Sequence, residues 1–362
     1  ANPAILHSSI ENAQSISQIL SKAKGSGKNI HEISLTFTSQ LQITNTDFHY
    51  LAQGLKGFKS LQKLSLKVED YSWISDKGLY YFMKGLIRLN SLKSLSLYFF
   101  CCNEFTDTGL DYLSQSLKKM AFLQTIKLEF IYLEKPTEKG LKILNGSLNR
   151  LTRLRDITLS IPESPNMKDQ SLSRINFKRL ASLQNIHFEF SYSPRLTDSA
   201  VYFLTEGLKG LVNLRKIKLE LWECTKVSDL GLHYIWEMMA TLPCLREISL
   251  KFSDCSKITD AGFEDLNKTM RCFLPLQKVK LEFYSCKKVT DSSLISVCRF
   301  LERFADLQNL QVYFSHCQKI TDVGVDAVLD CMNKQTSLRK VGIDFDCEKV
   351  TDKSLKKMVQ YF

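Results

Sequence analysis

The chain has 362 residues, 44% of them hydrophobic and 24% charged, a balance typical of an ordered protein with an apolar core. No apolar run reaches the roughly 18 residues needed to span a membrane, and the first residues lack the regions of a signal peptide. The net charge of +11 suggests nucleic acid or an acidic membrane surface as a partner. Whether either is expected depends on where the charges lie in the chain.

Residues 1–29 precede the first strand that we expect. Ile10, Ile16, Ile19 and Leu20 fall on one face of a helix, and the glycines after residue 24 end it. We therefore predict that residues 1–29 are a helical half-repeat that caps one end of the array that follows.

From residue 30 onward, one pattern of strand, loop and helix recurs. In residues 245–275, Leu245, Ile248 and Leu250 alternate as in a strand with one buried face, and Thr259-Asp260 begins a helix. Such a unit cannot bury its apolar face alone, so the units must stack. The strand starts lie 31 residues apart, except for one interval of 29: Ile30, Leu61, Leu92, Leu123, Leu154, Leu183, Leu214, Leu245, Leu276, Leu307 and Leu338.

The repeated motif, L-x-x-L-x-L-x-F-x-x-C-x-x-I-T-D-x-G-L, resembles the leucine-rich repeat in its cysteine-containing, ribonuclease-inhibitor-like forms. The period exceeds the usual range of about 20–29 residues. Phe99, Phe130 and Phe283 stand where many members of the family have asparagine. The resemblance implies an α/β solenoid shaped as a horseshoe, with a parallel sheet on its concave face and helices on its convex face. We expect residues 30–362 to form eleven repeats in one continuous solenoid.

The repeat at residues 154–182 departs from the others. It is two residues short, its loop carries Pro162 and Pro165, and Lys168 replaces the hydroxyl that precedes the acid elsewhere. We expect a change of loop path or curvature between residues 130 and 200.

Six of the eleven cysteines recur near one repeat position. A zinc site needs paired cysteines or nearby histidines, which this column lacks. Free cysteine is among the most often buried residues, so we interpret the column as buried, reduced thiols and predict no metal and no cofactor. The interpretation places the protein in the cytoplasm, with cytoskeleton or cilium as alternatives. The column is Cys102, Cys224, Cys255, Cys286, Cys317 and Cys347.

A Ser/Thr-Asp pair begins most of the expected helices, as at Thr106-Asp107 and Thr259-Asp260. A row of carboxylates is compatible with calcium binding or catalysis, but a helix cap and its dipole explain the pair without either. Two residues after the acid the chain has a small residue. Glycine inside a helix costs stability, so its recurrence predicts close approach of neighbouring repeats. These glycines are Gly78, Gly109, Gly140, Gly231, Gly262 and Gly324.

Basic residues such as Lys118, Arg150 and Arg303 lie near the opposite helix ends, where they offset the helix dipole along one rim. Aromatic residues do not alternate with them, so nucleic acid is not the expected partner. A rim that binds anions is nevertheless one alternative for the function. Gly25, Gly27 and Lys28 resemble part of a phosphate-binding loop, but that loop needs glycine at position 22 and a hydroxyl at position 29. No nucleophile or metalloprotease motif occurs, and we predict that the protein is not an enzyme.

The strand side chains that alternate with the buried ones should point to the concave face, where solenoids usually bind. Exposed aromatic residues anchor many interfaces, although single ones also occur without a role. The predicted partner-binding residues are Tyr98, Phe100, Glu189, Glu220, Trp222, Tyr284 and Tyr313.

The predicted function is a non-catalytic scaffold for protein–protein interaction in a eukaryotic cell, with protein partners on the concave face or rims. Two alternatives follow from the same resemblance. One is a structural subunit of a large cytoskeletal or axonemal assembly, and the other is a substrate-recognition adaptor of a ubiquitin ligase. No F-box-like segment precedes the repeats, which counts against the adaptor.

The last strand, expected at residues 338–345, keeps the apolar pattern of the interior strands, and Leu355 and Met358 follow at core spacing. Terminal repeats usually carry a polar outer face. We therefore expect further chain or a partner to cover this end.

Overall fold

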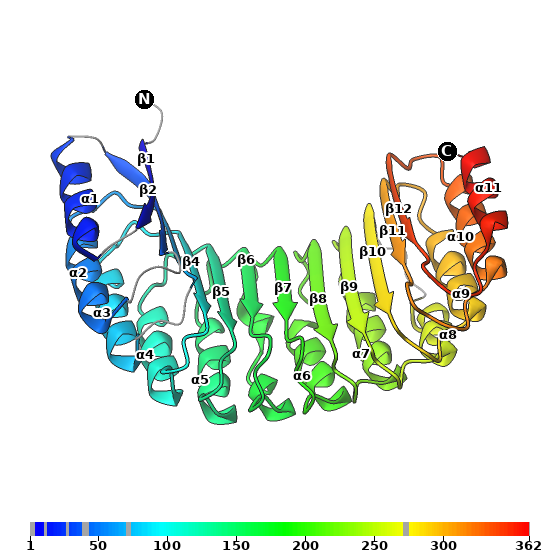
Figure 1. The fold of residues 1–362 in the computed structure, drawn as a ribbon, viewed down its shortest axis with the longest axis horizontal. Helices are drawn as coiled ribbons and strands as arrows, with labels where there is room; N and C mark the ends of the chain where they lie inside the picture. The colour runs from blue at the N-terminus through cyan, green and yellow to red at the C-terminus, as the bar shows by residue number, and fades with distance from the viewer. Residues whose placement is uncertain are drawn as a thin grey trace. The chain divides into compact units, whose positions relative to one another are not determined.

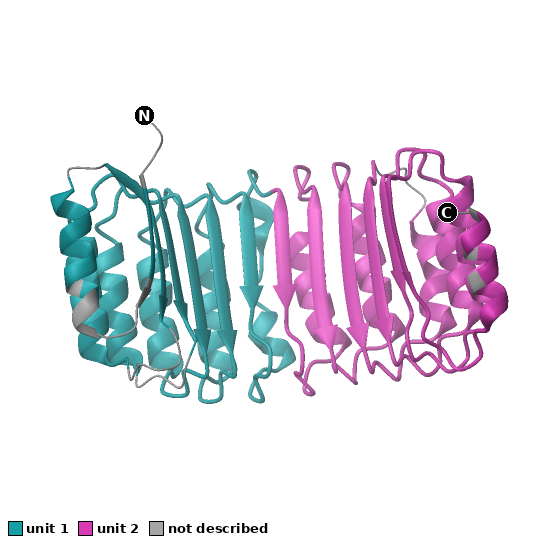
Figure 2. Cartoon of the chain, turned by 45° about the horizontal axis from the view of Figure 1, so that its top comes forward, with its two compact units in different colours: residues 1–183 teal, residues 184–362 magenta. Residues whose placement is uncertain are grey.

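The computed structural model describes residues 4–10, 13–26, 29–37, 43–69, 74–270 and 275–361. Contacts between residues divide the chain into two compact units, residues 1–183 (unit 1) and 184–362 (unit 2) (Figure 2). Within each unit strands and helices alternate, and the sheet forms the concave side while the helices form the convex side (Figure 1). None of the helices in the described ranges is long and apolar enough to cross a membrane.

Unit 1 carries six parallel strands among its described residues, hydrogen-bonded in chain order. Its elements are β1 (Ala4–Ile10), α1 (Ala13–Gly25), β2 (Ile30–Phe37), α2 (Asn45–Leu55), β3 (Lys63–Val68), α3 (Asp76–Leu86), β4 (Ser94–Phe100), α4 (Asp107–Leu117), β5 (Thr125–Ile131), α5 (Glu138–Leu148), β6 (Asp156–Ser160) and the 3₁₀ helices η1 (Asp169–Leu172) and η2 (Phe177–Arg179).

Unit 2 repeats the arrangement with six parallel strands in chain order and an α-helix after each strand, again among described residues. Its elements are β7 (Asn185–Glu189), α6 (Asp198–Leu208), β8 (Lys216–Trp222), α7 (Asp229–Ala240), β9 (Glu247–Ser253), α8 (Asp260–Thr269), β10 (Lys278–Tyr284), α9 (Asp291–Leu301), β11 (Asn309–Tyr313), α10 (Asp322–Lys334), β12 (Lys340–Asp344) and α11 (Asp352–Tyr361).

Alternate strand residues are buried against the helices, as the sequence pattern predicts. In β8, Ile217, Leu219 and Leu221 are buried, while the residues between them lie on the open face of the sheet. Most strands begin two residues after the predicted start. The first motif leucine, Leu61 for example, lies in the preceding turn, where its N–H donates to the Phe58 carbonyl 3.0 Å away.

Phenylalanines in the strand position that often carries asparagine stack on one another in the core. Phe99 and Phe130 lie with ring centroids 5.7 Å apart and planes at 10°, and Phe252 and Phe283 lie 5.3 Å apart at 12°. All four are buried. The departure from the family motif thus replaces a polar position with a buried ring stack, which adds apolar area to the contact between repeats.

A residue one to three positions after the strand adopts a left-handed backbone in eight of the described repeats, and none of the eight is glycine. In at least six of these repeats its N–H donates to a carbonyl of the next repeat, as Glu223 does to Ser253 at 2.9 Å. A non-glycine residue there costs roughly 1–2 kcal/mol, so the hydrogen bonds along the stack must hold the turn. These residues are Cys101, Tyr132, Glu163, Tyr192, Glu223, Asp254, Ser285 and His316.

The cysteine column is buried, which confirms this part of the interpretation. The Cys255 thiol donates to the Ser253 carbonyl at 3.4 Å, and the Cys317 thiol donates to the Phe283 carbonyl at 3.5 Å. Burial raises the pKa of Cys224 and of Cys317 to about 12, so both thiols stay protonated near neutral pH.

The Ser/Thr-Asp pairs do more than cap their own helices. The Thr259 hydroxyl accepts from the Ala261 N–H, as predicted for an N-cap. The preceding helix supplies Asp229, whose carboxylate accepts from the Thr259 N–H and hydroxyl, each at 2.7 Å. A Cβ on Gly262 would lie 2.7 Å from Asp229 Oδ1, so the glycine column exists because neighbouring repeats meet there, as predicted.

The N-terminal segment differs from our prediction. Residues 1–29 contain a strand as well as a helix, because β1 pairs in parallel with β2. The described residues therefore hold twelve strands where we predicted eleven. Leu6 and Ser8 lie opposite Ile33 and Leu35. This segment lacks the L-x-x-L-x-L spacing, which is why the repeat pattern missed it. Gly27 and Lys28, considered above as part of a phosphate-binding loop, lie outside the described residues.

The repeat at residues 154–182 is irregular, but in its helix, whereas we expected a change of loop path or curvature. After β6 the chain forms η1 and η2 in place of an α-helix of ten to thirteen residues. A 3₁₀ helix is short because its hydrogen-bond geometry is poorer, so the helix side of unit 1 is incomplete beside α5.

At the C-terminal end, the apolar side chains of β12 are only half-buried, unlike those of the interior strands. The side chains of Leu355 and Met358 lie outside the described residues. That further chain or a partner covers this end remains a prediction.

Candidate functional site

Three residues form one row across adjacent strands of unit 2: Trp222 on β8, Ser253 on β9 and Tyr284 on β10. Strands lie about 4.8 Å apart, so the two aromatic residues stand roughly 10 Å from each other, with the small serine between them. Large, small and large side chains on neighbouring strands leave a hollow above the small one.

The hollow has a volume of about 380 Å³. Tyr192 and Trp222 line it from one side, and Tyr284 and Tyr313 line it from the other. Ser253 and Ser315, both 4% exposed, also line it. Its size and its aromatic walls suit an apolar or aromatic side chain.

Cations and acids from the adjacent row enclose the aromatic residues. The Lys251 ammonium lies 3.7 Å from the centroid of the Trp222 ring, and the Lys280 ammonium lies 5.4 Å from that of Tyr313. Both lysines also pair with Glu282, at 3.7 and 3.1 Å. These contacts hold the rings in place, which lowers the entropy lost when a partner binds.

The indole nitrogen of Trp222 is buried and has no acceptor among the described residues. An unpaired buried donor costs about 1–3 kcal/mol. A partner that brings an acceptor to this nitrogen would recover that energy.

The predicted acids lie beside the hollow and form a separate ionic cluster. Glu220 accepts from the His187 ring at 2.8 Å and pairs with Lys218. Burial alone would raise the pKa of Glu220, but these hydrogen bonds outweigh it and lower the pKa from 4.5 to about 2.

His187, Glu189 and Glu220 offer ligand atoms within 4.8 Å of one another, an arrangement that the sequence did not suggest. Three such ligands suit a divalent cation in number. Since Lys218 already pairs with Glu220 and the His187 ring is hydrogen-bonded to it, we interpret the group as a cluster of polar contacts within the sheet. The absence of a bound metal stays a prediction.

Tyr98 and Phe100, also predicted to bind a partner, belong to unit 1. The Lys67 ammonium lies 5.1 Å from the Tyr98 ring, and the Phe100 ring meets the Tyr132 ring edge-on at 5.4 Å. The seven predicted residues thus fall into three groups, and Trp222, Tyr284 and Tyr313 are the group that lines the hollow in unit 2.

Sequence reasoning missed Tyr192 and Ser253. Tyr192 follows β7 and has a left-handed backbone, which places its side chain, 40% exposed, at the hollow. Ser253 is visible in the sequence as the small residue halfway between Trp222 and Tyr284. Its significance depends on the register, which only the strand pairing shows.

Comparison of the sequence with protein-family models and with curated proteins gives no match. Among solved structures, one chain of the yeast Rad7 and Elc1 complex is similar, with a TM-score of 0.55 and 17% identity. The match covers 96% of this chain and 79% of that chain. An identity this low speaks to the fold alone, and the parallel sheet and 31-residue repeat agree with it. The fold is a leucine-rich-repeat solenoid.

Proposed function

We propose that the protein is a non-catalytic scaffold that binds a protein partner through the strand face of unit 2. The observation that carries the proposal is the hollow between Trp222 and Tyr284 above Ser253. Aromatic residues held in place around an open hollow are typical of the centre of an interface. The partner would insert an apolar or aromatic side chain and place basic or acidic groups against Glu282 and Lys251.

The finer family assignment is part of this proposal. The buried column of free cysteines supports the cysteine-containing, ribonuclease-inhibitor-like type of repeat and a reducing intracellular compartment. The raised pKa values of Cys224 and Cys317 support a structural role for the column, because a thiol nucleophile requires a lowered pKa.

A photo-crosslinking experiment tests the binding face. The amino acid p-benzoylphenylalanine is introduced in place of Tyr284 on the strand face or Tyr202 on α6, and the variants are irradiated in a lysate of the native cells. The two tyrosines are matched in exposure, at 44% and 41%. We expect a discrete crosslinked protein from position 284 only, and Ser253→Trp, which fills the hollow, should abolish it. Crosslinking from position 202 alone would reject the strand-face proposal.

The second candidate is a structural subunit whose helix side contacts the assembly. Aromatic pairs on the helices favour it: the Tyr202 and Tyr234 rings lie 5.2 Å apart on α6 and α7, and the Tyr80 and Tyr112 rings lie 4.9 Å apart on α3 and α4. Tyr202 is exposed and the other three are half-buried. Crosslinking from position 202 would support this role. An adaptor of a ubiquitin ligase is a special case of the first proposal, in which the crosslinked protein is a substrate. The similar yeast chain was crystallised in a complex of two proteins, which agrees with a partner-binding role.

A further inference from the structure

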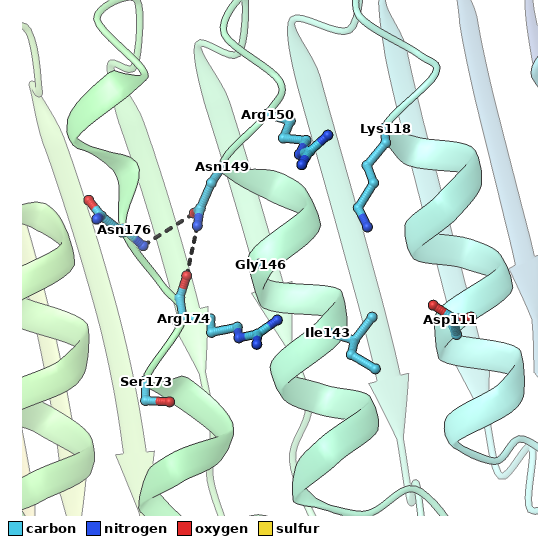
Figure 3. Close-up of a pocket in the computed structure, with 9 residues that line it drawn as sticks. All are labelled: Asp111, Lys118, Ile143, Gly146, Asn149, Arg150, Ser173, Arg174 and Asn176. Atoms are coloured by element: carbon cyan, nitrogen blue, oxygen red, sulfur yellow. Dashed lines mark hydrogen bonds between the residues drawn. The ribbon is translucent and has the colours of Figure 1, made fainter.

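A groove on the helix side of unit 1 lies beside the irregular repeat. It has a volume of about 550 Å³ and runs over α5, between α4 and the segment that joins η1 to η2 (Figure 3). Where other repeats place an α-helix of at least ten residues, this repeat has two 3₁₀ turns. The groove is therefore a consequence of the shortened repeat with its two prolines.

Three cations surround the groove. Lys118 reaches the surface of α5 from the side of α4, Arg174 reaches it from the irregular segment, and Arg150 reaches it from the C-terminal end of α5 (Figure 3). All three are exposed, and no ion pair neutralises any of them among the described residues. Among the described residues, one acid lines the groove, Asp111, which already accepts from Gln115 at 2.6 Å.

The backbone that presents Arg174 is fixed. Asn149, at the end of α5, donates to the Arg174 carbonyl at 2.8 Å and accepts from the Asn176 N–H at 3.2 Å (Figure 3). The stem of Arg174 packs over Gly146, where a Cβ would lie 3.3 Å from Arg174 Cδ. A larger residue at position 146 would displace the arginine. The backbone and the stem of Arg174 are thus placed beside α5 before any ligand binds, which favours binding.

The distribution of charge in the chain points the same way. Residues 1–183 contain 24 Lys and Arg against 15 Asp and Glu, a net charge of +9, whereas residues 184–362 contain 25 against 23, a net charge of +2. Two helix C-termini contribute about half a negative charge each at the groove. Three cations exceed these two half-charges and Asp111 together, so the groove remains positive and lies in the basic half of the chain.

We propose that this groove binds an acidic peptide segment of a partner protein, as a second surface independent of the strand-face hollow. Guanidinium groups match carboxylates in a two-pronged geometry. The groove holds several side chains rather than one ion, and Ile143 provides an apolar floor for the stems of glutamates. None of the described residues that line it is aromatic, so they offer no stacking platform to a nucleobase.

Fluorescence polarisation with a labelled peptide of about ten residues, half of them glutamate, tests the proposal, with the same peptide carrying glutamine as reference. The groove variant is Arg150→Gln with Arg174→Gln. The control variant, Lys178→Gln with Arg179→Gln, removes the same charge from exposed positions of the same repeat outside the groove. Circular dichroism and the urea midpoint verify that both variants fold.

We expect the groove variant to weaken binding of the glutamate peptide by tenfold or more and the control variant by less than twofold. A third variant, Gly146→Leu, keeps every charge and should weaken binding by displacing Arg174. If the groove and control variants lose the same affinity for the glutamate peptide, binding depends on net charge alone and the proposal is overturned. The proposal would also be overturned if the glutamate peptide does not bind the wild-type protein. The same holds if a DNA duplex binds more tightly than the peptide and the groove variant abolishes that binding.

Discussion

The Asp260 carboxylate accepts two hydrogen bonds from Thr290, the residue that caps the next helix: the Thr290 N–H lies 2.9 Å away and its hydroxyl 2.7 Å away. The same pair of bonds recurs in both units, for example from Thr106 to Asp76 and from Thr351 to Asp322. The acid that the sequence suggested as a dipole partner therefore joins one repeat to the next.

Replacing Asp260 by Ala should destabilise the protein by about 1–3 kcal/mol, because alanine leaves the Thr290 N–H and hydroxyl without their acceptor. Asn should cost less, because Asn45 already accepts from the Ser75 N–H at 2.9 Å and donates to the Ser75 hydroxyl at 3.0 Å in the equivalent position. Urea unfolding measures the change. Glu264→Gln removes one charge from an exposed position of the same helix and should change the stability by less than about 0.5 kcal/mol. Equal effects of Asp260→Ala and Glu264→Gln would show that the interaction depends on charge alone.

Gly262 offers a test of the contact between repeats. A Cβ there would lie 2.7 Å from Asp229 Oδ1, so alanine should destabilise the protein. Serine occupies the equivalent position 293, where its hydroxyl donates to Asp260 at 2.5 Å. We therefore expect Gly262→Ser to be more stable than Gly262→Ala by about 1 kcal/mol.

Intrinsic helix propensity predicts the opposite order, because alanine is the better helix former. Urea midpoints of the two variants distinguish the explanations. If the alanine variant is the more stable, the carboxylate does not reach residue 262 as the structure places it.

The cysteine column should resist thiol reagents in the folded protein. Cys255 and Cys286 are buried, so a reagent cannot reach their sulfur atoms. Burial also raises the pKa of both thiols, so the reactive thiolate does not form near neutral pH. Cys244 is exposed and serves as the internal control. The experiment uses a Cys272→Ser background, because that residue lies outside the described ranges.

We expect a thiol reagent followed by mass spectrometry to show rapid modification of Cys244 and modification of the column only in denaturant. Modification of Cys255 or Cys286 at the rate of Cys244 would contradict a buried column.

Glu220 should contribute to the acid stability of the protein. Its pKa falls from 4.5 to about 2 on folding, so the unfolded chain binds the proton more readily than the folded protein does. Its contribution is present above pH 4.5 and is lost as the pH falls toward 2.

Thermal unfolding of the wild type and Glu220→Gln between pH 7 and pH 2 measures this contribution. The difference in Tm should be constant above pH 4.5 and should shrink toward pH 2. A difference that does not change with pH would mean that His187 and Lys218 do not hold the carboxylate in its charged form.

The sequence alone determined the repeating unit and which of its side chains face the core. Alternation of Ile248, Leu250 and Phe252 and the Thr259-Asp260 pair are local signals, because strand alternation and helix capping depend on residues close in the chain. For the same reason Pro162, Pro165 and Lys168 marked this repeat as irregular, but they did not predict that 3₁₀ turns replace its α-helix.

Only the tertiary structure decided which of these residues meet. Trp222 and Tyr284 form one hollow because the pairing of β8, β9 and β10 places Ser253 between them, and strand register is a property of three chain segments together. Strand β1 forms by pairing with β2 although it lacks the motif leucines. The basic groove likewise required the structure, because Lys118, Arg150 and Arg174 approach one another only after the shortened repeat leaves the flank of α5 open.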